Sequence, residues 1–177
     1  MHDVHYLKID FGFNRENAPE IYDFLWIHMP TLLKKLSAKK VQIEIERLEP
    51  MDEIYTNLNL TEKGIKKIFD KFAKSHHLKQ VPSIVFDNSK TSLRATVPLG
   101  KLGKIFDDYN TLFDIFFTDT IIRTDNNLTF DMMDGFSNSL LVIGKKKHLE
   151  KLVAIAKKLL DKSTKFEFVD HSVERRT

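Results

Sequence analysis

The sequence SLRATVPLGK, residues 92–101, combines an apolar segment of strand character with a Gly-Lys turn, and a segment of helical periodicity follows it. The sequence SLLVIGK, residues 139–145, repeats this order of strand, Gly-Lys turn and helix. Strand-to-helix turns of this kind use the conformational freedom of glycine. The echo predicts that the second half of the chain contains two related units, each made of two strands and a helix.

Apolar and polar side chains alternate along several other segments, which is typical of strands with one buried face. We expect strands over residues 7–13, 41–46, 84–86, 93–97, 128–132 and 166–168. Apolar residues at helical spacing predict helices that begin near residues 17, 59–61, 103 and 145. Strands with one polar face favour antiparallel or mixed pairing. We therefore expect one α+β domain over residues 1–170, with a mixed, mostly antiparallel sheet covered by about four helices. The polar residues 171–177 are expected to form a flexible tail.

The composition limits the kinds of protein that this chain can be. The 177 residues contain no cysteine, which excludes disulfide frameworks, thiolate nucleophiles and cysteine-ligated metals. The formal net charge of +3 is too small to indicate a polyanionic partner by itself. The first residues show no signal peptide, and no apolar run approaches the length of a membrane span. These features favour a cytoplasmic protein.

The first predicted helix has more apolar surface than one sheet face can bury. One apolar stripe of this helix consists of Tyr22, Trp26, Met29 and Leu33. Such a helix either lies between two layers of its own fold or contacts a partner. Aromatic side chains carry much of the binding energy of interfaces. Our leading hypothesis is therefore a non-enzymatic module that uses this stripe to bind a protein partner or a second copy of itself.

Lysines gather on the polar faces of the second and last predicted helices and at the two Gly-Lys turns. The candidate anion-binding residues are Lys63, Lys67, Lys71, Lys74, Lys101 and Lys145. Basic amphipathic helices of this kind can bind nucleic acid through its phosphates. A solvated lysine face is the simpler interpretation. Binding of nucleic acid or another anion is therefore the second hypothesis.

Carboxylates on the first two predicted strands suggest a third hypothesis, a metal-dependent hydrolase or nuclease. Glu44 and Glu46 share one face of their strand, and Asp10 could join them if the two strands are neighbours. Three carboxylates could hold Mg²⁺. Cross-strand pairing with lysines such as Lys8 is the alternative. No motif indicates a nucleophile with its base or a bound cofactor, so the sequence leaves open whether the protein is an enzyme.

Overall fold

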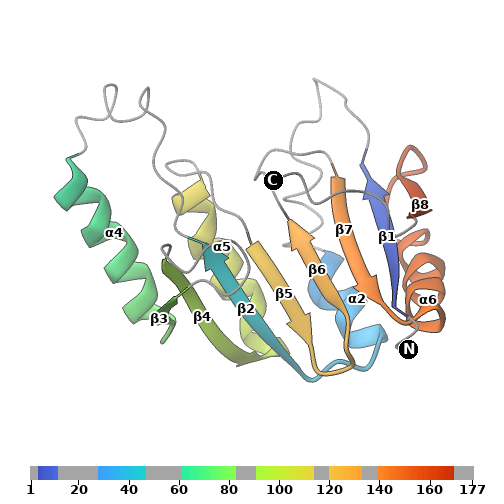
Figure 1. The fold of residues 1–177 in the computed structure, drawn as a ribbon, viewed down its shortest axis with the longest axis horizontal. Helices are drawn as coiled ribbons and strands as arrows, with labels where there is room; N and C mark the ends of the chain where they lie inside the picture. Colours follow the sequence, from blue (N-terminus) through green and yellow to red (C-terminus); the bar gives the residue numbers. More distant parts are fainter. Residues whose placement is uncertain are drawn as a thin grey trace.

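The computed structural model describes residues 4–11, 28–46, 61–82, 91–113, 120–132 and 139–169. The described residues form one antiparallel sheet of eight strands together with four α-helices, so the α+β class is confirmed (Figure 1). In chain order the elements are β1 (His5–Asp10), α2 (Met29–Lys35), β2 (Lys40–Glu46), α4 (Glu62–Ser75), β3 (Lys79–Pro82), β4 (Thr91–Pro98), the 3₁₀ turn η2 (Leu99–Lys101), α5 (Leu102–Phe113), β5 (Thr120–Thr124), β6 (Thr129–Met132), β7 (Ser139–Gly144), α6 (Lys146–Ala156) and β8 (Lys165–Val169).

The strands lie in the order β3-β4-β2-β5-β6-β7-β1-β8. Every pair of neighbours is antiparallel, so the expectation of a mixed sheet is wrong among the described strands. The reason lies in the crossovers. A strand–helix–strand connection gives two parallel strands, but here the two strands of such a connection are never neighbours: three strands separate β1 from β2, and one antiparallel strand separates the members of the other pairs.

This strand order divides into two nested halves with the same connectivity. Elements β2-α4-β3-β4-α5-β5 form an inner half. From β5 to β3 its strands lie in the order β5-β2-β4-β3, which are the fourth, first, third and second strands of this half in the chain. Elements β1-α2 and β6-β7-α6-β8 form an outer half with the same internal order. Each half is a split βαβ arrangement of the β-α-β-β-α-β type. The echoed stretches are equivalent in these halves, because β4 leads into α5 as β7 leads into α6. That these are related units stays a prediction, which depends on the echo between residues 92–101 and 139–145.

The chain passes between the outer and inner halves at two points, and hydrogen bonds join these points. The first is the connection between α2 and β2, and the second is the turn between β5 and β6. The backbone N–H of Lys39 donates to the carboxylate of Asp125 at 3.2 Å. The amide of Asn126 donates to the carbonyl of Leu36 at 2.9 Å. The inner half is inserted into the outer half, so the place where the chain enters it and the place where the chain leaves it must be neighbours. These hydrogen bonds hold the two places together.

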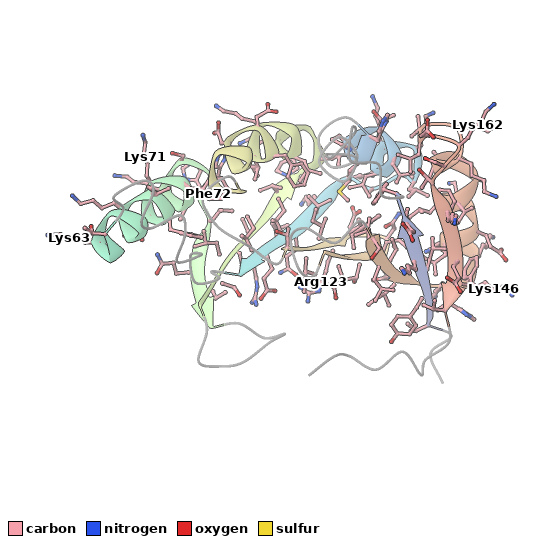
Figure 2. All side chains as sticks on the ribbon, turned by 90° about the horizontal axis from the view of Figure 1, so that it is seen from above. Lys63, Lys71, Phe72, Arg123, Lys146 and Lys162 are labelled. Carbon is pink, nitrogen blue, oxygen red and sulfur yellow. The ribbon has the colours of Figure 1, made fainter. Side chains whose placement is uncertain are left out.

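One face of the sheet carries the core, and the helices lie on that face (Figure 2). Its strand residues follow the alternation expected from the sequence, as in Leu7 and Ile9 or Ile43 and Ile45, all almost fully buried. Each helix adds a buried apolar stripe. The helical core residues are Met29, Leu32, Leu33, Phe69, Phe72, Ala73, Leu102, Ile105, Phe106, Leu149, Leu152 and Ala156. The opposite face of the sheet carries polar residues such as Glu44 and Arg123, together with the apolar Ile121, Leu141 and Ile143.

Candidate functional site

Three charged side chains form a cluster on the sheet face opposite the helices, where Figure 2 labels Arg123. Glu44 on β2 lies opposite Arg94 on β4, and Arg123 comes from β5 on the other side of β2. Arg94 donates to Oε1 of Glu44 at 3.0 Å, and Arg123 donates to Oε2 at 3.1 Å. Each carboxylate oxygen therefore accepts a charge-assisted hydrogen bond, the stronger kind of hydrogen bond in proteins.

Burial sets the electrostatics of this cluster. The side chain of Glu44 is 2% exposed, whereas those of Arg94 and Arg123 are 20% and 36% exposed. Burial raises the pKa of Glu44, but the hydrogen bonds and charges of the two arginines lower it by a larger amount. The net shift of this pKa is therefore downward from 4.5. The carboxylate is charged at neutral pH. The cluster ties β4, β2 and β5 together and leaves one net positive charge on this face.

The proposed carboxylate site for a metal does not form. The hypothesis required the strands of Asp10 and Glu44 to be neighbours, but β5, β6 and β7 lie between β1 and β2. Four strand spacings separate the two strands by about 19 Å along the sheet. Both oxygens of Glu44 are engaged by arginines, and the part of the chain that the structure describes holds no group of three metal-ligating side chains. Glu46 is the last residue of β2, so its backbone lies as many strands away from Asp10 of β1 as that of Glu44 does.

The structure also changes the stripe predicted on the first helix. Tyr22 and Trp26 lie outside the described residues. Met29 and Leu33 belong to α2 and are 0% exposed, so their assignment to a partner-binding surface is wrong. They are buried because α2 packs against α6 and η2 as well as against the sheet. The helix therefore has neighbours on several sides and not only on the side of the sheet. This is the layered alternative that the sequence left open.

The six candidate lysines are all exposed, but they do not form a single surface. Lys63, Lys67, Lys71 and Lys74 lie on α4, at one end of the sheet, and Lys145 precedes α6 at the other end (Figure 1). Figure 2 shows the same separation, with Lys63 and Lys71 far from Lys146 and Lys162. Lys101 belongs to neither helix, because it ends η2. Any anion would therefore meet α4 or α6, and one short ligand would not meet both.

A surface that the sequence analysis missed is the outer edge of β8. Phe168 on this strand is 46% exposed and is the one large apolar side chain that is exposed among the described residues. β8 pairs with β1 on one side, and no described strand lies on its other side. Strand edges present unpaired N–H and C=O groups that can pair with another strand. Alternation within residues 165–169 was the available signal, but only the strand order places this segment at an edge.

The other edge of the sheet has protection that β8 lacks. β3 has four residues and ends at Pro82, which has no N–H to donate. The amide of Gln80 donates to Asp70 of α4 at 2.9 Å, which ties a helix to this edge. β8 has five residues and no proline. Of the two edges, β8 is therefore the one suited to pairing with another strand.

No model of a protein family, no characterised protein and no solved structure matches this chain. None of the helices in the described ranges has the length and apolar character needed to cross a lipid bilayer. The functional proposal therefore depends on the geometry of the described surfaces.

Proposed function

We propose that this protein is a non-enzymatic interaction module that binds an extended strand along the outer edge of β8. The exposure of Phe168 on an edge strand is the observation that carries the proposal. The lack of cysteine suits a reducing compartment, so we place the module in the cytoplasm. Tyr22 and Trp26 on the first predicted helix remain candidates for a second contact.

Addition of a strand would pair the backbone along the outer edge of β8 and would also cover part of Phe168. Backbone hydrogen bonds between the added strand and β8 supply affinity, and side chains on alternating positions supply specificity. Phe166 and Phe168 lie on the helix side of the sheet, opposite Ile9 and Leu7 of β1. An added strand would place apolar side chains beside Phe168 and bury part of its exposed ring, which is favourable at about 25 cal/mol per Å².

Peptide display from a random library tests this proposal, because the selection itself identifies the sequences that bind. Selection on the wild-type protein should enrich peptides with alternating apolar and polar residues, the pattern that a strand beside β8 needs. The variant Phe168→Glu should lose these peptides because it places a charge where apolar contact is expected.

The matched control is Ala154→Glu, which adds the same charge at an exposed position of α6 and not on β8. It should retain the peptides. Thermal unfolding of both variants should remain close to that of the wild type. Failure to enrich any peptide that depends on Phe168 would refute strand binding at this edge.

A second candidate function is the binding of a polyanion by α4. Lys63, Lys67 and Lys71 are exposed and recur every fourth residue, so they lie along one side of the helix at intervals of about 6 Å. A row of cations can neutralise successive phosphates of a nucleic acid. The opposite side of α4 packs into the core through Phe69 and Phe72.

Heparin chromatography and nucleic-acid binding over a range of salt concentrations test this second candidate. The double variant Lys67→Glu/Lys71→Glu should elute at lower salt than Lys147→Glu/Lys151→Glu, which makes the same charge change on α6. Equal losses in the two variants would show attraction by overall charge and would exclude a site on α4.

A further inference from the structure

We infer that the strand bound at the edge of β8 is β8 of a second copy of this chain, in an antiparallel pair across a two-fold axis. This inference rests on the proposed function and adds the identity and register of the partner. Symmetric pairs of identical subunits are the most common protein oligomers, and their interfaces must be self-complementary. The sequence Lys165-Phe166-Glu167-Phe168-Val169 meets that condition in one register.

Geometry limits the registers that are available. A two-fold axis perpendicular to the sheet joins two β8 strands into one continuous sheet with the helices of both copies on the same side. Side chains alternate between faces, so each residue must then lie opposite a residue of the same face. One residue of β8 therefore lies directly opposite its own copy, with the axis midway between them. This central residue can be Phe166, Glu167 or Phe168.

Charge selects the register centred on Phe166. It places Lys165 of each copy opposite Glu167 of the other copy, which gives two pairs of opposite charge. The register centred on Glu167 places two carboxylates directly opposite each other, and like charges in that position are destabilising. The register centred on Phe168 leaves Glu167 opposite Val169.

The existing sheet extends the same pattern of charge. Within one copy, Lys165 lies opposite Asp10 and Glu167 lies opposite Lys8. In the inferred dimer, Asp10 and Lys165 of one copy are therefore followed by Glu167 and Lys8 of the second copy. The signs alternate along this row across four strands, and two-fold symmetry repeats the row. Lys165 and Glu167 therefore each lie between two partners of opposite sign.

The opposite face supplies the apolar contact. Phe166 lies opposite Phe166 of the second copy, and Phe168 lies diagonal to that ring. Diagonal neighbours in a sheet are about 7–8 Å apart, which is within reach of aromatic side chains. The dimer would thus cover part of Phe168, which is 46% exposed.

Charge reversal in separate and mixed samples tests the inference. We expect the wild type to dimerise in sedimentation velocity experiments, and Lys165→Glu and Glu167→Lys to dimerise at least about ten-fold more weakly when each is alone. An equimolar mixture should form a heterodimer of nearly wild-type affinity. In the mixture each Glu at 165 meets a Lys at 167, and each Glu at 167 meets a Lys at 165.

The mixture isolates the contact between copies, because each variant perturbs Lys8 or Asp10 of its own chain equally when alone and when mixed. The matched control is the pair Glu150→Lys and Lys151→Glu, which lie exposed on α6 and should dimerise like the wild type. Weak association in the mixture would overturn the register, as would unchanged association of the single variants.

Two outcomes separate this inference from the proposed function. A wild-type chain that stays monomeric up to about 1 mM, the weak limit of specific association, would overturn the second copy as the partner. The proposed function would then depend on the peptides selected by display. If those peptides also fail to depend on Phe168, both the function and the dimer are refuted.

Discussion

Replacement of Glu44 by glutamine should destabilise the protein strongly, because it removes the carboxylate that two arginines share. Glutamine has nearly the same shape, but only one of its two terminal atoms can accept a hydrogen bond. Its NH₂ group would face the guanidinium of Arg94 or Arg123, where donor would meet donor. The variant therefore loses one of the bonds of 3.0 and 3.1 Å and the single negative charge that both arginines share.

The magnitude follows from the burial of the three groups. Removing one partner of a buried ion pair costs about 3–5 kcal/mol. The arginine side chains are 20% and 36% exposed, so they can regain some contact with water when Glu44 is lost. We therefore expect the free energy of unfolding at pH 7 to fall by about 3 kcal/mol, the lower end of that range.

Urea unfolding at several pH values is the assay. The pKa of Glu44 is lower in the folded protein than its ordinary value of 4.5, so its stabilising contribution is complete above that pH. The contribution is lost as the pH falls through the lower, folded-state pKa. Glutamine does not titrate, so the stability difference between wild type and variant should be constant near neutral pH and should shrink in acid.

The control variant is Glu150→Gln on the exposed surface of α6, which should change the free energy of unfolding by less than about 0.5 kcal/mol. A Glu44→Gln variant within that range of the wild type would refute the stabilising role of the cluster. A stability difference that does not change in acid would assign the loss to packing and not to charge.

Four further substitutions test separate parts of the fold by the same unfolding assay. Gly144→Ala should cost about 1–3 kcal/mol, because its Cβ would lie 2.6 Å from Cδ2 of the buried Leu128, whereas Gly103→Ala meets no atom within 4 Å and should be neutral or stabilising. Asn126→Ala should cost about 1–3 kcal/mol, since it removes one of the side-chain bonds between the two chain crossings and leaves the partly buried carbonyl of Leu36 unpaired. Thr61→Ala should cost about 1 kcal/mol, because the Thr61 hydroxyl caps α4 by accepting from the N–H of Gly64 at 3.2 Å. A loss below about 0.3 kcal/mol in either of the last two variants would contradict the assigned contact.

Local pattern predicted those elements whose side chains alternate or recur at regular spacing. Ile43 and Ile45 alternate with polar residues, and the strand containing them forms as expected. The segment Lys79–Pro82 has no such pattern and was not predicted as a strand. It becomes β3 because β4 offers a free edge with which its backbone can pair. Hydrogen bonding to a distant strand, which no local pattern records, decided this element.

The candidate sites show the same division. Glu44 was singled out from the sequence, but as a metal ligand, because the arginines that hold it are 50 and 79 residues away along the chain. Met29 was singled out for an apolar contact with a partner, but it is buried in the core of its own chain. Phe168 was expected in a strand, and its exposure depended on which strand lies at the edge. In each case the residue type was informative and its surroundings were not predictable.

The sequence by itself determined the α+β class, the polar and apolar faces of the regular strands, and the two strand–turn–helix segments with Gly-Lys between strand and helix. These properties depend on side chains close together in the chain, where the periods of helices and strands act directly. Only the tertiary structure decided the nesting of one half within the other, the pairing of Glu44 with two arginines and the position of β8 at an edge. Those properties depend on which distant backbones form hydrogen bonds, and that choice is made by the packing of the whole chain.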